Sequence, residues 1–347
     1  MENSDSNEVK FYPQSNAKVI LNDNRTIDIP VSEIRIPVST GIILAGKVFG
    51  NLPTNNPKNK IIALHGWLDN CELYTDIAPR IIAHYYEKNE TASFIAFDSA
   101  GHGLSEHRSE DYGEVYYLWD YIADFLSALD ILEWKNFIIF GHSYGGILAY
   151  AFAGTFPTRV TGLMVYENLG FMNFQTPEMH PMLLAEYLKI KTNENKRNTK
   201  RAVKIFPSFN SACQNRAQGR YSTSLSVSRK LLKRGLKRIK PEIDKGIKGG
   251  YAYTYDTRVV YSNYILPITW SLEQVEMFFK RIKCPTHVIL ATDGIYKDGD
   301  TEGRLKFLVN VKEFKFDVVK GNHHFLLEEE SIEELTTLTN SFLDSLE

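Results

Sequence analysis

The sequence predicts an α/β protein built on a mostly parallel, doubly wound sheet. Short apolar runs at 61–64, 93–97 and 137–140 alternate with longer helical stretches, and the connections between them are short. Apart from Ser93 these runs are continuously apolar, as is typical of strands buried on both faces of a sheet that helices cover. The alternation breaks near Leu169 and resumes at Thr286, which indicates an insert between two parts of one sheet.

The elements follow in order along the chain. Residues 1–30 are polar, Asn-rich and without periodicity, and we expect a loose arm there. The β-rich runs 32–38 and 41–49 are expected to pair as a leading hairpin. The further expected elements are strands 61–64, 93–97, 137–140, 162–166, 286–291 and 313–319, and helices over 69–84, 116–134, a stretch ending at 156, and 332–346.

The core is thus expected over residues 31–168 and 265–347, with a helical cap inserted at 169–264. Within this insert the apolar side chains at 227, 231, 232, 236 and 239 fall at helical spacing, and no strand is evident. Of the chain's 40 basic and 42 acidic residues, 18 basic and 3 acidic ones lie between Lys189 and Lys248. The sequence therefore predicts a basic cap on an acidic body.

Composition limits the class of protein. No stretch of eighteen apolar residues occurs, and the first residues lack the pattern of a signal peptide, so we expect a soluble, cytoplasmic protein. The three cysteines, Cys71, Cys213 and Cys284, suggest neither a disulfide framework nor a metal site, and we expect no cofactor. Nucleic-acid binding is not expected, because no aromatic stacking platform accompanies the basic residues.

The central motif is Gly141-His142-Ser143-Tyr144-Gly145, which stands between an apolar strand and an apolar helical segment. A strand, a sharp turn and a helix with this G-x-S-x-G pattern form a nucleophile elbow, which displays the serine hydroxyl. Glycines flank the serine because Cβ atoms there would collide. Ser143 is therefore the candidate nucleophile.

With this motif and three others, the chain resembles the α/β-hydrolase superfamily over nearly all of its length after residue 30. The other motifs are His65-Gly66-Trp67, the D-x-x-GHG stretch 98–103, and the GNHH stretch 321–324. More narrowly, HGWLDN (65–70), SAGHGLSEH (99–107) and GNH (321–323) are similar to those of the serine hydrolase-like proteins. The resemblance implies an α/β-hydrolase fold with a serine nucleophile, a histidine base and an orienting acid.

The base is expected after the final strand, beside the elbow at the carboxyl edge of the sheet. Two neighbouring histidines stand there, and residues adjacent in a loop usually point in different directions. The Gly-x-His form of the resemblance selects His323, whereas counting back from Phe325 in a His-Phe pattern selects His324. We favour His323.

The orienting acid is expected after the penultimate strand, where Asp293 follows the run 288–292. Asp293-Gly294 is also a good turn pair, so a purely structural role remains an alternative. Glu167, which follows the strand 162–166, is the other candidate acid.

The oxyanion hole is expected to use two backbone N–H groups, those of Trp67 and Tyr144. Trp67 follows an early strand end, and Tyr144 follows the nucleophile. We assign Asp98 and His102 to holding their own loop, because they follow an earlier strand.

The sequence thus predicts a serine hydrolase that acts on a carboxylic ester or related acyl group of a small molecule. Another reaction of the same scaffold, such as C–C bond hydrolysis, and a catalytically weak binding or signalling protein are the alternatives. Phe171, Met172 and Phe174 are candidates for an acyl pocket. The basic run 229–240 is either a solvated face or a contact for anionic substrates or a membrane surface. The oligomeric state and the substrate do not follow from the residues.

Overall fold

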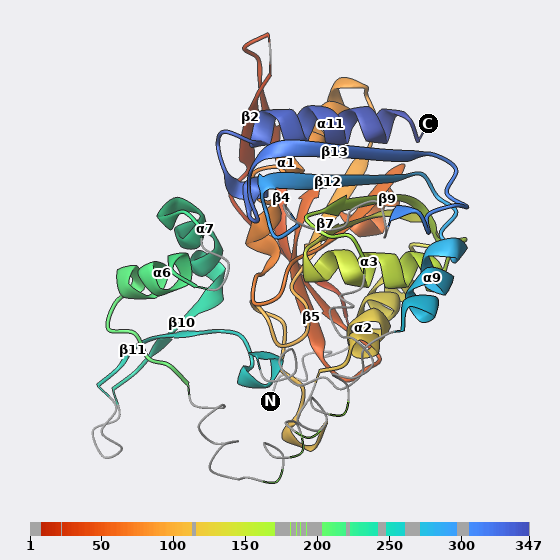
Figure 1. Cartoon of the computed structure of the whole chain (residues 1–347). Coiled ribbons are helices and arrows are strands. Elements are labelled where there is room, and N and C mark those ends of the chain that lie inside the picture. The colour runs from red at the N-terminus through yellow and green to blue at the C-terminus, as the bar shows by residue number, and fades with distance from the viewer. Residues whose placement is uncertain are drawn as a thin grey trace.

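The structure is a computed structural model of the whole chain (Figure 1). It describes residues 8–21, 23–112, 116–170, 203–219, 223–241, 248–260, 271–296 and 305–346, with single positions at 181, 185, 188 and 192. The candidate acyl-pocket residues 171, 172 and 174 lie outside the described residues.

The strands are β1 (Lys10–Pro13), β2 (Ala17–Ile20), β3 (Thr26–Ile29), β4 (Val31–Pro37), β5 (Ile43–Gly50), β6 (Asn59–Leu64), β7 (Ala92–Phe97), β8 (Phe137–His142), β9 (Val160–Tyr166), β10 (Leu236–Ile239), β11 (Gly250–Tyr253), β12 (Thr286–Asp293) and β13 (Phe314–Asn322). The helices are α1 (Ala78–Glu87), α2 (Leu118–Ile131), α3 (Tyr144–Thr155), α6 (Phe209–Ala217), α7 (Leu225–Gly235), α9 (Leu272–Arg281) and α11 (Ile332–Asp344). Short 3-10 helices lie at η1 (Pro53–Asn55), η2 (Cys71–Tyr74), η3 (Glu110–Tyr112) and η5 (Phe325–Leu327).

One large sheet organises the core, in the order β1-β4-β5-β7-β6-β8-β9-β12-β13. Strands β7 to β13 of this order pair in parallel, whereas β1, β4 and β5 form an antiparallel edge. The predicted mostly parallel, doubly wound sheet and its leading hairpin are therefore confirmed. Because parallel strands end at the same edge, the loops after β6, β8, β9, β12 and β13 gather together there.

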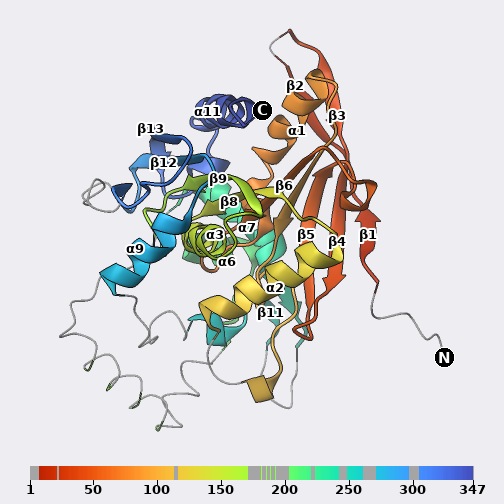
Figure 2. The same cartoon turned by 90° about the vertical axis from the view of Figure 1, so that its right-hand side faces the viewer.

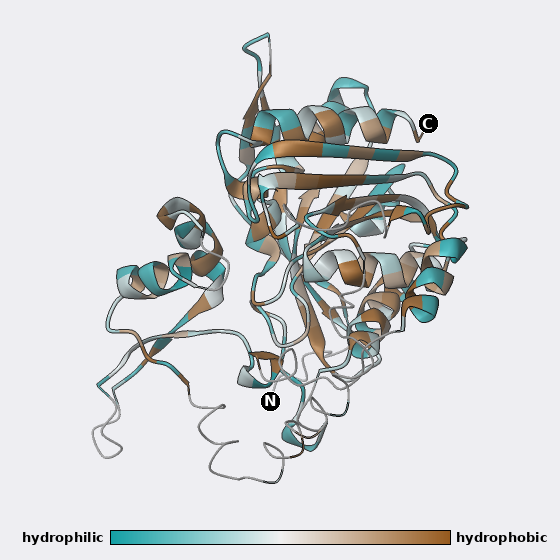
Figure 3. Ribbon diagram, in the orientation of Figure 1, coloured by the Kyte–Doolittle hydropathy of each residue, from teal (hydrophilic) through white to brown (hydrophobic). Residues whose placement is uncertain are grey.

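Helices cover both faces of this sheet, as Figures 1 and 2 show. In β6, Ile62 and Leu64 pack into the core on the side of α2, α3 and α9, whereas Ile61 and Ala63 pack into the core on the side of α1 and α11. Successive side chains of a strand point to opposite faces, so a strand covered on both faces must be apolar throughout. The strands are accordingly mostly brown on the hydropathy scale of Figure 3.

The N-terminal segment differs from the expected loose arm. Within 8–30, β1 extends the main sheet beside β4, and β2 and β3 pair as a separate hairpin. The polar composition concealed an alternating pattern in which Val19 and Ile29 are buried in the core on the α1 side. The helix expected over 69–84 begins only at Ala78, because Asn70 caps the short turn η2 first.

Between β9 and α9 the described elements are α6, α7, β10 and β11, which we call the cap elements. They lie beside the carboxyl edge of the sheet and apart from its two helical layers (Figure 1). The sequence predicted one helix that continues to Ile239, but α7 ends at Gly235. Leu236 to Ile239 instead pair with β11 as a two-stranded sheet. The expectation that this segment holds no strand was wrong.

Candidate active site

Ser143 occupies a sharp turn between β8 and α3. Its backbone has φ 52° and ψ −118°, a left-handed conformation that costs a residue with a side chain about 1–3 kcal/mol. The glycines on both sides are required: a Cβ on Gly141 would lie 2.4 Å from the Gly145 oxygen, and one on Gly145 would lie 2.0 Å from the Leu64 oxygen. The turn therefore brings the end of β6 against the serine and leaves its hydroxyl accessible.

Two hydrogen bonds connect Ser143 to a carboxylate through His323. The Nε2 atom of His323 lies 3.0 Å from the Ser143 Oγ, and its Nδ1 atom lies 2.9 Å from Oε2 of Glu167. An ionised carboxylate only accepts, so Nδ1 carries the proton and Nε2 offers its lone pair to the serine hydroxyl. This tautomer is the one that can take a proton from Ser143.

Glu167 is held in place by the end of β12 and by the loop after it. It is fully buried and has a positive φ of 53°, so its side chain turns back from the end of β9 toward the next strand. The backbone N–H of Ala291 donates to Oε1 at 2.7 Å, and that of Ile295 donates to Oε2 at 2.9 Å. Gly294 leaves room for the carboxylate, because a Cβ there would lie 2.2 Å from Oε1.

The structure corrects the choice of acid, since Glu167 and not Asp293 contacts His323. Asp293 is exposed, and its Oδ2 accepts a hydrogen bond from Thr292 at 3.1 Å. The pairing of β12 with β13 shifts between Ala291 and Asp293, and this irregularity accompanies the outward position of the carboxylate. Asp293 thus has the turn position that its Asp-Gly sequence also allowed.

His324, the alternative base, points elsewhere. Its ring is buried, and its Nε2 atom lies 3.2 Å from Oδ2 of Asp69, in the loop after β6. Burial lowers the pKa of His324. The two neighbouring histidines therefore face different carboxylates, and only His323 reaches the serine.

His142 is a residue of the site that the sequence reasoning did not single out. Its Nε2–H donates to the backbone oxygen of His323 at 2.6 Å, so the end of β8 fixes the loop that carries the histidine of the site. Burial lowers the pKa of His142 well below its ordinary value, which keeps the ring neutral. No pattern signals this role, because the contact depends on where β13 ends relative to β8.

The expected oxyanion donors lie on two segments that adjoin Ser143: Tyr144 follows it directly, and a Cβ on Gly66, before Trp67, would lie 3.2 Å from the Ser143 Cβ. Helix α3 begins at Tyr144, so its amide is among those that have no partner within the helix. Before Trp67, the Gly66 oxygen accepts from His65 Nδ1 at 2.7 Å, while His65 Nε2 accepts from the Ser99 amide at 3.0 Å. The Gly66 C=O and the Trp67 N–H belong to one peptide unit, and in a trans peptide these two groups point in opposite directions. The bond to the Gly66 oxygen therefore also fixes the direction of the Trp67 N–H.

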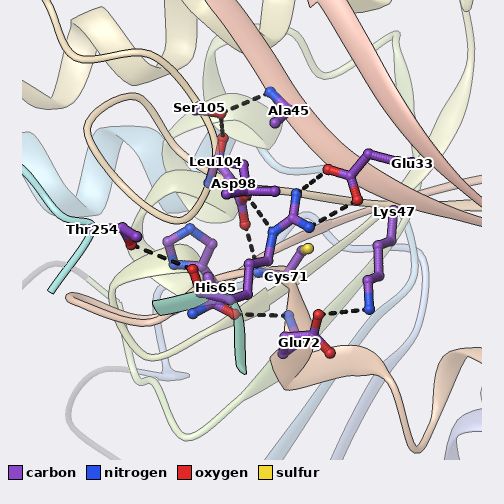
Figure 4. Close-up of polar contacts among 12 residues, drawn as sticks. Glu33, Ala45, Lys47, His65, Cys71, Glu72, Asp98, Leu104, Ser105 and Thr254 are labelled. Carbon is purple, nitrogen blue, oxygen red and sulfur yellow. Dashed lines mark hydrogen bonds and ion pairs between the residues drawn. The ribbon is translucent and has the colours of Figure 1, made fainter. Parts of the chain in front are cut away.

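The Asp98 loop has a structural role, as its position after an earlier strand suggested. Asp98 accepts from the amides of Cys71 at 2.8 Å and Leu104 at 2.7 Å, and from Arg234 Nε at 2.6 Å. Arg234, on α7, also bonds both carboxylate oxygens of Glu33. The carboxylates of Glu33 and Asp98 thus approach the same guanidinium group, and Figure 4 shows both of them. This buried group joins a cap element to the core.

A cavity of about 240 Å³ lies between the cap elements and the loop after β6. Trp67 and Leu68 line it from the core, and Leu231, Leu232 and Tyr253 line it from the cap elements. Its walls are thus mixed, with apolar and polar side chains. Among the residues that the structure describes, no group of three or more His, Cys, Asp or Glu side chains could hold a metal ion.

Comparisons with known proteins agree with this geometry. The model of the α/β hydrolase fold matches residues 59–330, and the chain belongs to the α/β-hydrolase family. Among its relatives, a serine hydrolase-like protein of Danio rerio is 28% identical over 84% of this chain and 83% of its own. A serine hydrolase-like protein of Dictyostelium discoideum is 30% identical over 86% of this chain and 78% of its own.

A solved structure of a hypothetical protein from Pseudomonas aeruginosa PAO1 has a similar fold. It is 27% identical, superposes with a TM-score of 0.74, and covers 90% of this chain and 99% of its own. The family and the names of the relatives support hydrolase activity. In the described part of the chain, no helix is long and apolar enough to cross a membrane.

Proposed function

We propose that the protein is a serine hydrolase that cleaves a carboxylic ester or related acyl bond of a small molecule. The observation that carries this proposal is the series of contacts from Ser143 through His323 to Glu167, with distances of 3.0 and 2.9 Å. Each group matches a requirement of acyl transfer: a hydroxyl, a base in the correct tautomer, and an acid behind the base.

In this proposal, Ser143 Oγ attacks the acyl carbon as His323 Nε2 takes its proton. Glu167 stabilises the imidazolium that forms, and the amides of Tyr144 and Trp67 hold the oxyanion. His323 then gives the proton to the leaving oxygen, the acyl group stays on Ser143, and water, deprotonated by the same nitrogen, releases the acid. The proposed binding space is the cavity that adjoins Trp67, and the proposed substrate is therefore small.

Labelling with a fluorophosphonate and hydrolysis of short p-nitrophenyl esters test this function. Wild type is expected to do both, whereas Ser143→Ala should do neither and His323→Ala should lose ester hydrolysis. Labelling that persists in Ser143→Ala would remove this serine from the proposed role. Wild-type protein that neither labels nor hydrolyses esters of any chain length would favour a binding protein or another reaction of the scaffold.

A binding protein without turnover would be favoured if no acid stood behind His323. Glu167 now has a short contact with His323 and two backbone donors of its own. These contacts support a protein with turnover over one that only binds. C–C bond hydrolysis uses similar residues, and a wild type that labels at Ser143 but hydrolyses no ester would favour it.

A further inference from the structure

A second polar chain lies beside the proposed triad and begins on the cap. Arg216 of α6 makes an ion pair with Oδ1 of Asp69, which belongs to the loop after β6. Asp69 in turn faces His324 Nε2, at 3.2 Å from Oδ2 and 3.4 Å from Oδ1. The His324 ring lies 5.2 Å from that of His323, centre to centre.

We propose, on the basis of the function proposed above, that Arg216 is a positioning residue, which neutralises Asp69 from the cap and so keeps His324 uncharged beside His323. The site would then be complete only while α6 is seated on the core. This also gives a role to Asp69, which lies in the HGWLDN motif and has no part in the acyl transfer.

Asp69 needs a cationic partner because its carboxylate is only 3% exposed. Burial alone would raise the pKa of this carboxyl, but the Arg216 guanidinium and the hydrogen bond with His324 hold it far below its ordinary value. With Arg216 present the guanidinium supplies the positive charge. Without it, the nearest group able to take up a proton and pair with Asp69 is His324.

The surroundings of His324 favour its neutral form while Arg216 is in place. The titratable and charged groups that face it are Asp69, Arg216, His323 and His142. In the described part of the chain, His324 Nδ1 is buried and has no hydrogen-bond partner. A proton added to His324 Nδ1 would therefore be a buried donor without an acceptor. It would also place a positive charge next to His323, which must itself become positive during the reaction.

The consequence for catalysis has a definite sign. A charged His324 about 5 Å from His323 repels the positive charge that His323 acquires when it takes the proton of Ser143. The rate should therefore fall at pH values where His324 is protonated and recover as pH rises. We expect Arg216→Gln to raise the titration midpoint of His324 by about one pH unit or more. Below that midpoint kcat should fall about tenfold or more, with a smaller effect on KM.

The experiment combines two readouts on the whole protein. Histidine NMR titrations, assigned with His324→Gln, follow His324 without substrate, and the pH profile of kcat for p-nitrophenyl ester hydrolysis follows its effect. Arg216→Lys should restore most of the wild-type behaviour, because it keeps the charge. In Arg216→Gln combined with Asp69→Asn, the shift should disappear, since the uncompensated carboxylate is gone.

Asp76→Asn is the matched control. Asp76 pairs with Lys230 of α7, so this change removes another ion pair between the core and the cap elements. It should leave the His324 titration unchanged. The proposal is overturned if Arg216→Gln titrates like wild type, or if Asp76→Asn shifts His324 as much. Wild type that hydrolyses no ester would defeat the proposed function, while the NMR result would still decide the charge coupling.

Discussion

Replacing Glu167 by glutamine removes the charge behind His323 and nearly preserves the shape. The carboxylate lies 2.9 Å from Nδ1 and accepts two backbone amides, and the glutamine oxygen can still accept one of them. The amide nitrogen, however, can place a donor where Nδ1 needs an acceptor. The imidazole would then turn or change tautomer, and Ser143 would lose its base.

The size of the loss follows from the charge interaction. A carboxylate and an imidazolium about 4 Å apart attract by about 4 kcal/mol at an effective dielectric constant near 20. Since about 1.4 kcal/mol corresponds to a factor of ten in rate, Glu167→Gln should lower kcat about a thousandfold. KM should change little, because the lost interaction forms fully only in the transition state.

The matched control is Asp293→Asn, at the exposed carboxylate that follows the penultimate strand. It should keep at least about half of the wild-type activity, since surface substitutions of this kind have small effects. Steady-state hydrolysis of a p-nitrophenyl ester measures both variants, and thermal unfolding checks that each is folded. A folded Glu167→Gln with near wild-type kcat, or an Asp293→Asn with the larger loss, would refute the assignment of the acid.

Three further predictions concern stability. Arg234→Met should lower the free energy of unfolding by about 3–5 kcal/mol in urea titrations, because it leaves buried carboxylates unpaired, whereas the exposed Lys233→Met should change it little. Equal effects would contradict the buried pairing. Gly145→Ala should lower the free energy of unfolding by about 1–3 kcal/mol and reduce labelling of Ser143, since the new Cβ would collide with the Leu64 oxygen. Unchanged stability and labelling would argue against the tight elbow. The buried His142 stays neutral in the folded protein, whereas in the unfolded chain it takes up a proton below pH about 6.5. The free energy of unfolding should therefore fall below that pH, by up to about 1.4 kcal/mol per pH unit for each such histidine. Equal stability at pH 7.5 and 5.5 would contradict this.

Much of the fold could be predicted from the sequence because its signals are local. Continuous apolar runs identify β6, β7 and β8, and the glycines around Ser143 identify the elbow. The strands β1 to β3 were missed because each is only four residues long and mixes polar with apolar side chains. Short, partly exposed strands depend on pairing with distant segments, and a local pattern cannot reveal such pairing.

In the candidate site, too, one residue could be predicted from a local signal and another could not. His323 follows from its place after the last strand, but the acid depends on which of two neighbouring loops turns inward. Glu167 turns inward through its left-handed backbone and two amides, that of Ala291 near the end of β12 and that of Ile295 in the loop after it. Neither feature has a residue pattern, so the sequence could name Glu167 only as the alternative to Asp293.

The uneven charge of the chain also acquires a physical account. Cations of the cap elements point into the acidic body: Arg216 pairs with Asp69, Lys230 with Asp76, and Arg234 with Glu33 and Asp98. Part of the basic excess of the insert is therefore used to seat α6 and α7 on the core. For these three side chains, this explains the charge without a membrane or a nucleic acid.

The central claim is that the hydroxyl of Ser143 takes up the acyl group of a substrate. The most direct measurement is peptide mass spectrometry of a p-nitrophenyl ester reaction quenched during the first turnovers. We predict an added acyl mass on the peptide that contains Ser143, absent from Ser143→Ala. An acyl group found only on another residue, or turnover that continues in Ser143→Ala, would contradict the account.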